Sequence, residues 1–415
     1  MFDAHPIIRP PPVEVVQDSE KQNAPVFRVV LTGGPCGGKT TAQQQLMDTF
    51  SSLGWKVFRV PEAATLLLGG GVVFSECTPE QSFIFQEQLL LAMLSIENVF
   101  FEMARSNSEL GIKTIVLCDR GAMDASAYIS REDWRRILER NGLDEVELRD
   151  ARYDVVVHLV TAADGAEGYY TLANNAARSE GLSLARELDK KSCNAWVGHP
   201  VLDIIDNSTP FTQKIERATA AVAKRLNIPG VPTIDQRKYK FLVASLPESF
   251  PVEHQDFQVV HDYLISDGTT AADGDRIPQL RIRRRGQGKL FTYTLTQRVR
   301  LPDGQRLETR RSIAAREYET LLAQRDTTRN SIVKRRICFM SDSRYYHIDV
   351  FQEPHAGLLL LETYSQGPPE LPPFLDVIRD VTNDPDYSMF NLSRISPSPC
   401  AEATVSSSPS LEIYE

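Results

Sequence analysis

Apolar residues in the first half of the chain form short runs, and stretches with helical spacing of apolar residues lie between them. The runs cover residues 27–31, 56–60, 114–118, 154–160 and 201–205. A long helix is expected over about 78–106, because Thr78-Pro79-Glu80-Gln81 combines a capping box with proline at the first helical position. A second is expected over 211–226. Wholly apolar strands that alternate with helices predict a parallel sheet covered on both faces.

The second half of the chain has a different pattern. Strand-like segments cover residues 238–243, 279–285, 291–299, 332–339, 345–351 and 358–362, and Pro302-Asp303-Gly304 is a hairpin signal. Helices are expected only near 255–264 and 313–325. This half is therefore predicted to be an α+β domain, mainly antiparallel β.

The change of pattern falls at Pro229-Gly230-Val231-Pro232, which breaks a helix. We expect one domain over 25–228 and another over 238–395, with a linker over 229–237. A proline-rich leader (1–24) and a Ser/Pro-rich tail (396–415) are expected to be disordered.

Composition bounds the class of protein. With 415 residues, 42% apolar and 24% charged, the chain is typical of a globular protein of two domains. A net charge of −9 argues against sequence-specific nucleic-acid binding. The six cysteines include no C-x-x-C pair, so free thiols in a reducing compartment are expected. No apolar stretch reaches the ~18 residues that a membrane span needs. We expect a cytoplasmic protein, with contact at the periphery of a membrane left open.

The strongest motif is the run Gly33-Gly34-Pro35-Cys36-Gly37-Gly38-Lys39-Thr40, which satisfies G-x-x-x-x-G-K-[ST] between an expected strand and an expected helix. Glycines let the backbone N–H groups converge on phosphates, Lys39 supplies a positive charge and the Thr40 hydroxyl is a Mg²⁺ ligand. The helix N-terminus adds positive potential. The alternative, a glycine-rich turn, does not require so many constrained positions. We predict that this loop, with Thr41, binds a nucleoside triphosphate and Mg²⁺. GTP and ATP both remain open, because the chain has no N-K-x-D sequence.

Further residues resemble those of nucleoside- and nucleotide-kinase-type P-loop domains. Asp119 follows the third strand and could hold Mg²⁺ through water, while Arg120 could reach a transferred phosphate. Glu62 follows the second strand and could face an acceptor substrate, or could be an ordinary strand-end carboxylate. The polar segment 161–200 has the length of a kinase lid. Arg178 and Arg186 are its candidates to close over the triphosphate, unless they are solvated helix residues.

Basic residues alternate along strands of the second half. The residues 281–311 include ten Lys or Arg against two acidic residues. Alternation places such side chains on one face of a sheet, where they predict an anion site for polyphosphate or a phosphorylated head group. The alternative is a solvated face of a sheet attracted to RNA or membranes. Strict alternation on three strands favours an enclosed pocket. The cations in question are Arg281, Arg283, Arg285, Arg298, Lys334 and Arg336.

This half resembles the CYTH, or triphosphate tunnel, family. The segment 236–243 aligns with that family's E-x-E-x-K opening, and 280–283 and 361–362 fit later strands. Gln236 and Lys238 replace the two opening glutamates, which bind catalytic metal in the family. A later E-x-E keeps only Glu362. Loss of these carboxylates predicts a binding tunnel without hydrolysis. Lys238 and Lys240 then join the anion-binding cations, and Glu308, Asp349 and Glu362 are the carboxylates that remain.

Over residues 25–395 the chain resembles the TRPL translocation defect protein family. The order of the two domains and the segment Trp196-Val197-Gly198-His199-Pro200, followed by 202–207, carry this resemblance. It implies an AAA-like nucleotide-binding module, also found in bifunctional NAD-biosynthesis regulators, joined to a phosphoinositide- or phosphatidic-acid-binding domain that acts in membrane-protein trafficking. Residue patterns by themselves indicate only nucleotide and anion binding. Two enzymatic alternatives stay open: a small-molecule kinase that uses Glu62 and Arg120, and a tunnel-domain polyphosphate hydrolase, which Gln236 and Lys238 disfavour.

Overall fold

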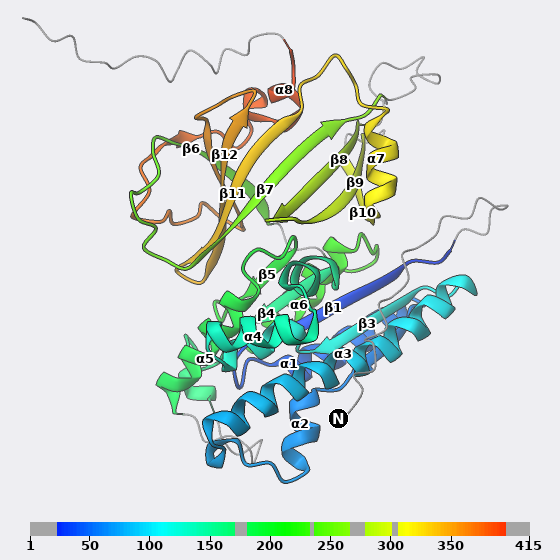
Figure 1. Ribbon diagram of the computed structural model, residues 1–415, viewed down its shortest axis with the longest axis vertical. Helices are drawn as coiled ribbons and strands as arrows, with labels where there is room; N and C mark the ends of the chain where they lie inside the picture. The colour runs from blue at the N-terminus through cyan, green and yellow to red at the C-terminus, as the bar shows by residue number, and fades with distance from the viewer. Residues whose placement is uncertain (1–22, 171–180, 233–235, 266–278, 301–305, 396–415) are drawn as a thin grey trace, which may run out of the picture.

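The computed structural model describes residues 23–170, 181–232, 236–265, 279–300 and 306–395. They form a parallel sheet with helices and, beyond residue 236, a separate antiparallel sheet (Figure 1). Residues 1–22 of the expected leader, the expected tail, Arg178 and the whole hairpin signal at 302–304 lie outside the described residues. No disulfide joins the five cysteines within them, in agreement with the expected thiols.

Five parallel strands form the first sheet, in the order β2-β3-β1-β4-β5. The predicted parallel sheet is confirmed, with each strand within three residues of its expected bounds. The strands are β1 (Val26–Thr32), β2 (Lys56–Val60), β3 (Thr114–Asp119), β4 (Val155–Leu159) and β5 (Leu202–Ile205).

Helices cover both faces of this sheet. Leu31 and Val157 pack with α1 (Lys39–Ser52) and α6 (Phe211–Arg225) on one face. Neighbouring strand residues point the other way, where Val30 and Val156 pack with α3 (Pro79–Glu109) and α4 (Arg131–Asn141). Alternate strand residues are thus buried on opposite faces, which explains why the central strands β1, β3 and β4 are mostly apolar, whereas the edge strand β2 includes the exposed Lys56 and Arg59. Two further helices flank the strand ends, α2 (Ala63–Gly69) and α5 (Leu182–Ala195).

The helix α3 corrects one expectation from the sequence. Its capping box is present, with the Gln81 backbone N–H donating to the Thr78 hydroxyl. Among the described residues it is the single helix whose length and composition would allow it to cross a membrane, where we had expected no such stretch. However, residues such as Leu90 and Leu94 pack on the sheet. The core helix of a globular domain meets the same length and composition criteria, so α3 is weak evidence for a membrane span.

Nine strands form the second sheet, in the order β10-β9-β8-β7-β11-β12-β13-β6-β14, and every neighbouring pair is antiparallel. The helix α7 (Ala315–Leu322) packs on the side of β8 and β9 that carries Ile282 and Leu295 (Figure 1), and α8 (Met389–Leu392) follows the last strand. The strands are β6 (Arg237–Val243), β7 (His254–Tyr263), β8 (Gln279–Gln287), β9 (Leu290–Arg300), β10 (Arg306–Ile313), β11 (Ile332–Ser341), β12 (Arg344–Glu353), β13 (Leu359–Ser365) and β14 (Val377–Asp380).

The expected helix over 255–264 is wrong, because this segment is the strand β7. Phe257, Val259, His261 and Tyr263 are all buried. Their spacing of two is the period of a strand with one buried face. Apolar residues at 257, 260 and 264 also fit a helix, and the partner strands β8 and β11, which lie far away in sequence, decide the outcome.

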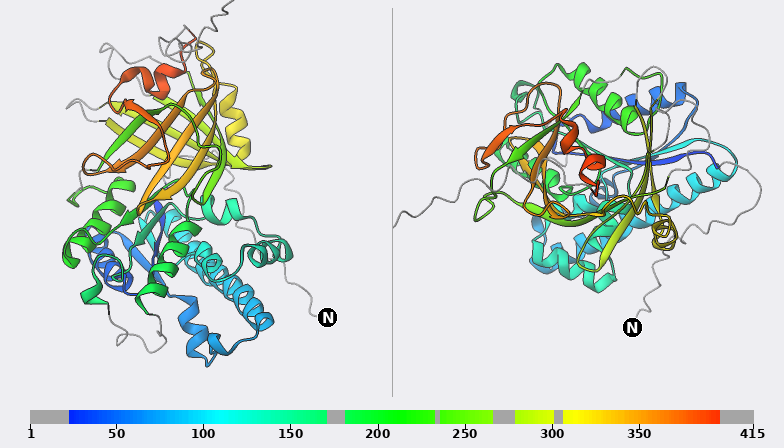
Figure 2. Two further views of the ribbon diagram at one scale, coloured as in Figure 1. Left: turned by 90° about the vertical axis from the view of Figure 1, so that its left-hand side faces the viewer. Right: turned by 90° about the horizontal axis from the view of Figure 1, so that it is seen from above.

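The second sheet curls (Figure 2). We call the face that carries the side chains of Arg281, Arg283 and Arg285 its inner face, and the opposite face its outer face. Tyr364 on β13 lies near enough to Arg298 on β9 to influence the pKa of that guanidinium, although four strands lie between them in the sheet. Among the described strands, the pairing order does not close on itself. Its two edges are β10 and the short strand β14.

Candidate functional site

The glycine-rich loop leaves β1 and enters α1 at Lys39. Gly33 and Gly38 have φ angles of 131° and 95°, which glycine adopts without strain. A Cβ at Gly33 or Gly37 would clash with the carbonyl oxygen of Leu159 at the end of β4. Among the described residues no side chain caps α1, so the amides of its first turn are left for an anion. Thr40 and Thr41 lie exposed on that turn.

The Lys39 amine lies over its own loop, where it donates hydrogen bonds to the carbonyl oxygens of Gly33 (2.8 Å) and Gly34 (2.9 Å). Burial and the guanidinium of Arg120 lower the pKa of Lys39 to about 8, while nearby carboxylates, Asp119 first, act in the opposite direction. No carboxylate in the described part of the chain forms an ion pair with this amine. A bound phosphate would supply the opposite charge.

The two predicted strand-end charges meet beside this lysine. Arg120 has a φ of 66° directly after β3, and its Nε lies 2.7 Å from Oε1 of Glu62. Burial opposes ionisation of Glu62, but the charge of Arg120 and the hydrogen bonds from Thr65 and Arg120 together outweigh it, so the pKa of Glu62 is lowered. Burial, together with the charge of Glu62, raises the pKa of Asp119. Oδ1 of Asp124 lies 3.5 Å from Nη1 of Arg120. The result is an arginine held between carboxylates at the strand ends where parallel-sheet proteins bind ligands.

A second group that shapes the loop was not predicted from the sequence. Asp189 on α5 accepts a 2.6 Å hydrogen bond from the Gly34 N–H, and His158 on β4 contacts the same carboxylate at 3.2 Å. The Thr161 hydroxyl donates to the Pro35 carbonyl at 2.5 Å. Asp189 is one of two acidic residues in a polar helix, the other being Glu187, so no spacing rule distinguishes it. The phosphate loop is therefore held in shape by residues far along the chain.

The predicted lid is described only in part, since Arg178 lies outside the described residues. Arg186 donates to the carbonyl oxygen of Ala163 (2.6 Å) and pairs with Glu167 (2.8 Å). Both side chains of that pair are about half exposed. These contacts tie α5 to the segment that follows β4 and leave the phosphate role of Arg186 a prediction.

The sheet order, the glycine-rich loop and the helix behind it define the first domain as a P-loop nucleotide-binding domain. The family model described as AAA domain matches residues 28–214. Among solved structures, the PH1819 protein from Pyrococcus horikoshii OT3 is 19% identical over 31% of this chain and 77% of its own, with a TM-score of 0.24, a likeness too small to support an argument. No curated protein matches the chain.

The register of the second sheet places the predicted cations on the inner face. Arg283 lies opposite His261 of β7 and Thr294 of β9, and Arg336 lies opposite Asp349 of β12. Side chains directly opposite each other in antiparallel strands share a face. The inner face therefore includes cations from β6, β8, β9, β10 and β11, namely Lys238, Lys240, Arg281, Arg283, Arg298, Arg310, Lys334 and Arg336.

Several of these cations already have carboxylate partners. Asp349, which is fully buried, pairs with Lys334 (2.5 Å) and with Arg336 (2.7 Å). Burial and the neighbouring Arg336 lower the pKa of Lys334 to about 7, while Asp349 opposes that change. The charges of Arg336 and Lys334 hold the pKa of Asp349 well below its usual range, although burial acts to raise it. These three residues form a closed charge cluster.

Glu362 forms the second cluster, with Lys238 at 2.6 Å and Lys240 at 3.4 Å. His347 contacts Glu362 at 2.8 Å, and burial together with Arg336 lowers its pKa to about 4, so the imidazole is neutral at pH 7. The donor atoms of His347, Asp349 and Glu362 lie within 4.8 Å of one another, a geometry that a metal ion could use. Because lysine and arginine already neutralise both carboxylates, the donor set does not fit a divalent cation well.

Arg281 and Arg283 have a different environment. A third carboxylate, Glu308, pairs with Arg298 (2.5 Å) and with Arg310 (3.2 Å). By contrast, Arg281 and Arg283 are 8% and 7% exposed and form no ion pair with any described residue. The Nε atoms of both lack hydrogen-bond partners there. Burial and the repulsion of other arginines lower the pKa of Arg283 well below its usual value. A buried guanidinium without an anion is unfavourable, and a bound anion would relieve it.

Two residues that sequence reasoning missed complete this part of the inner face. His261 is 4% exposed, and neither ring nitrogen has a hydrogen-bond partner among the described residues; the same holds for the Tyr263 hydroxyl. Burial, followed by Lys334 and the two unpaired arginines, lowers the pKa of His261 well below its usual value. A neutral imidazole and a phenol offer hydrogen bonds next to two cations. Both residues lie in the segment that we expected to be a helix.

Arg285 has partners other than a predicted ligand. Its Nη1 lies 2.5 Å from Oδ2 of Asp150, its Nη2 donates to the Gly198 carbonyl, and its guanidinium stacks 3.5 Å from the ring centroid of Phe257. Asp150 and Gly198 belong to the first domain. This arginine therefore joins the two domains.

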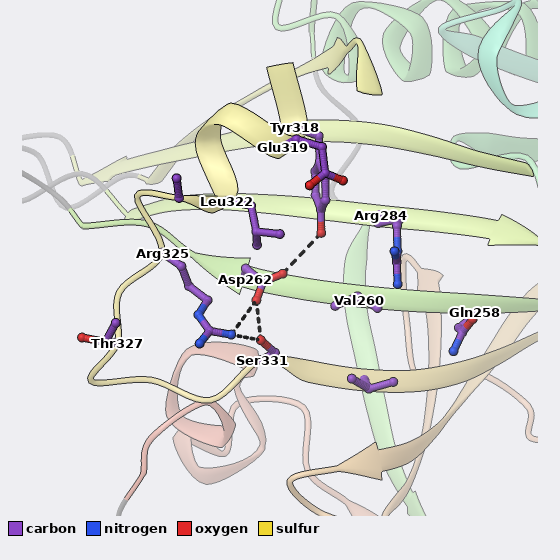
Figure 3. A pocket seen from close by; sticks show the side chains of 12 residues that line it. Gln258, Val260, Asp262, Arg284, Tyr318, Glu319, Leu322, Arg325, Thr327 and Ser331 are labelled. Carbon is purple, nitrogen blue, oxygen red and sulfur yellow. Dashed lines mark hydrogen bonds and ion pairs between the residues drawn. The ribbon is translucent and has the colours of Figure 1, made fainter. Parts of the chain in front are cut away.

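A cavity of about 720 Å³ lies on the outer face of the second sheet, away from both sites (Figure 3). The buried carboxylate of Asp262 lines it and contacts Ser331 (2.5 Å), Tyr318 (3.4 Å) and Arg325 (4.0 Å). These contacts join β7, α7 and the segment before β11. Since the carboxylate already has three partners, the cavity gives no indication of a ligand.

Proposed function

We propose that this chain binds a magnesium nucleoside triphosphate, GTP or ATP, at its P-loop and a phosphorylated anion on the inner face of its second sheet. The anion is either a phosphoinositide or phosphatidic acid head group or a polyphosphate. Regulation of membrane-protein trafficking at the cytoplasmic side of a membrane completes the proposal, and its support is the family resemblance of residues 25–395. The observation that carries the anion site is the pair of buried arginines, Arg281 and Arg283, without an anionic partner among the described residues.

At the first site, the residues fit a magnesium-bound triphosphate. The Thr40 hydroxyl and the Asp119 carboxylate are hard oxygen donors of the kind that Mg²⁺ prefers. Lys39 would turn from its loop carbonyls to the outer phosphates, and Arg120 is near enough to this lysine to lower its pKa. The bound ion would neutralise phosphate charge.

At the second site, charge favours a ligand with several phosphates. Apart from Arg285, which pairs with Asp150, the inner face combines eight described cations with three carboxylates, a formal excess of five positive charges with His261 and His347 neutral. A single phosphate monoester offsets less than half of this excess. The neutral imidazole of His261 can exchange a hydrogen bond with a hydroxyl, which an inositol ring offers and a linear polyphosphate lacks. Both features support phosphoinositide over phosphatidic acid.

The test compares two neighbouring arginines of β8. Arg283→Gln removes an inner-face cation, while Arg284→Gln removes an arginine that points outward and stacks on Phe291. We expect Arg283→Gln to abolish binding to vesicles that contain a phosphoinositide and Arg284→Gln to leave it intact. Calorimetric titration with Mg²⁺ and GTP or ATP should give the same affinity for both variants. Unchanged vesicle binding by Arg283→Gln would refute the anion site.

A small-molecule kinase is a second candidate, because Glu62 lies 2.7 Å from Arg120 beside the phosphate loop. In that reaction Glu62 would accept the proton of an acceptor hydroxyl. The purified chain would be incubated with labelled ATP and a panel of nucleosides and nucleotides. Labelled product that is lost in Glu62→Gln supports the kinase, and no product with any acceptor contradicts it. Hydrolysis of tripolyphosphate by Lys39→Ala would instead indicate an active tunnel.

A further inference from the structure

A buried contact links the two proposed binding sites. Arg285 is 2% exposed and lies on β8, two residues from Arg283 and four from Arg281. All three side chains lie on the same face because side chains alternate along a strand. The strand that presents the unpaired cations is therefore the strand that is fixed to the first domain.

The contact is made of several interactions rather than one ion pair. Asp150 accepts from Arg285 and, at 2.7 Å, from Nε of Arg149. Both guanidinium groups lie over the ring of Phe257 on β7, at 3.5 and 4.9 Å from its centroid. Nη2 of Arg149 also donates to Gln287, the last residue of β8. Removal of one partner would leave a buried charge unmatched, so this contact is stiff.

On the side of the first domain, Arg285 ends on the turn between α5 and β5. The Gly198 carbonyl accepts from Arg285, and Gly198 has a φ of 101°. A Cβ at this position would lie 2.6 Å from the Phe257 ring, so the turn and the second sheet are in close contact. Movement of this turn must therefore move Phe257 or Arg285.

The same turn reaches the nucleotide site through Trp196, which is fully buried. Its Nε1–H donates to Oδ2 of Asp124 at 3.3 Å. The other oxygen of Asp124 accepts from the hydroxyl of Thr32, the residue before the phosphate loop, and contacts Arg120 at 3.5 Å. Asp124 thus divides its hydrogen bonds between the nucleotide site and the turn.

We propose that nucleotide binding and anion binding are coupled through the contacts Arg120–Asp124–Trp196 and Gly198–Arg285. This inference rests on the proposed function and adds the regulation of its two sites. Phosphates at the P-loop attract the Arg120 guanidinium and change its contact with Asp124. Because Asp124 also accepts from Trp196, this change shifts the turn that carries Gly198. An anion on Arg281 and Arg283 reduces the repulsion that Arg285 exerts on Arg283. Each ligand then changes the affinity for the other by the same factor.

The experiment measures that factor in the full chain. Inositol trisphosphate is titrated calorimetrically with and without saturating Mg²⁺ and nucleotide, and nucleotide is titrated with and without inositol trisphosphate. We expect the two ratios of dissociation constants to be equal and to differ from one by at least about fivefold. Ratios of one, with both ligands bound, would overturn the coupling and leave the proposed function standing. Failure of either ligand to bind would overturn the proposed function and the coupling with it.

Two variants test the path. Arg285→Met removes the charge but keeps an unbranched side chain, and Trp196→Phe keeps a buried ring but removes the N–H that Asp124 accepts. Each ligand alone should still bind to both variants, while the coupling ratio should fall to about one. Arg335→Met, which removes a half-exposed arginine paired with Asp256 on the outer face, should keep the wild-type ratio. If Arg285→Met does not fold, Trp196→Phe decides. A wild-type ratio in the variants that fold would show that these residues do not carry the coupling.

Discussion

Buried charges are paired differently at the two proposed sites. At the P-loop, the only partners of Lys39 within the described part of the chain are backbone carbonyls, while the carboxylates of Glu62 and Asp124 contact Arg120. On the inner face, each of three carboxylates is shared by two cations, and only Arg281 and Arg283 lack an ion pair among the described residues. In both places the residues without a counter-charge are the ones to which a ligand would bind. The comparison shows that a candidate anion site is indicated less by the number of cations than by which of them lack an ionic partner.

The largest loss of stability is expected when a carboxylate shared by two cations is removed. Asp349→Asn would leave Lys334 and Arg336 buried without a partner and should lower the free energy of unfolding by about 3–5 kcal/mol. Asp256→Asn makes the same chemical change in a half-exposed pair with Arg335 and should change it by only ~0–1 kcal/mol. Urea denaturation followed by circular dichroism measures both. Equal losses in the two variants would contradict the cluster as described.

The next largest effect is a dependence of nucleotide affinity on pH, which distinguishes the P-loop from the inner face. The pKa of Lys39 is lowered to about 8, and phosphate binding requires the protonated amine. Nucleotide affinity should therefore be complete below pH 8 and fall as pH rises through 8, by up to about tenfold per pH unit until the pKa of the bound form is reached. Calorimetry between pH 6.5 and 9.5 tests this. In Lys39→Arg the charge persists, so the affinity should not vary over that range; a decline in this variant would assign the effect to another group.

A smaller effect has an unusual sign. Arg283 is buried, unpaired and repelled by neighbouring arginines, which lower its pKa. Arg283→Met should therefore raise the free energy of unfolding by about 1 kcal/mol, since an apolar side chain can replace buried charge without loss, while anion binding is lost. Thermal unfolding without ligand is the measurement. A lower melting temperature would mean that Arg283 contributes to the fold and not to a binding site.

The smallest effect concerns Glu308, whose side chain is about one-third exposed. Glu308→Gln should cost less than about 1 kcal/mol of stability. It should strengthen binding of inositol trisphosphate several-fold, because it frees Arg298 and Arg310 and increases the positive excess of the inner face. Titration at two salt concentrations would check the electrostatic origin, since salt should reduce the gain. Weaker binding in this variant would mean that the carboxylate itself contacts the ligand.

Local patterns predicted the parts of this molecule that depend on neighbouring residues. The five parallel strands, the loop over 33–40 and the capping box of α3 all follow from short segments, and all are present. Alternation likewise placed Arg281 and Arg283 on one face before any strand pairing was known. The helix expected over 255–264 failed because its residues fit both periods, and only pairing with β8 and β11 selects the strand.

The remaining features depend on contacts between distant segments. Asp189 fixes Gly34 from 155 residues away, and Arg285 pairs with Asp150 from 135 residues away. The alternation of Arg281, Arg283 and Arg285 along the strand does not show that the first two lack an ion pair while Arg285 binds the first domain. That distinction is set by the first domain, whose surface cannot be derived from the strand.

The open ends of the second sheet have a consequence for association between molecules. An unpaired edge strand exposes backbone N–H and C=O groups to which another chain can add a strand. The edge β10 carries Arg310 and Arg311, both exposed, and the opposite edge β14 has four residues. Arg310 pairs with Glu308 and Arg311 with Glu317. A strand added along β10 would have to bury or displace these charged pairs, which disfavours edge-to-edge association of two copies.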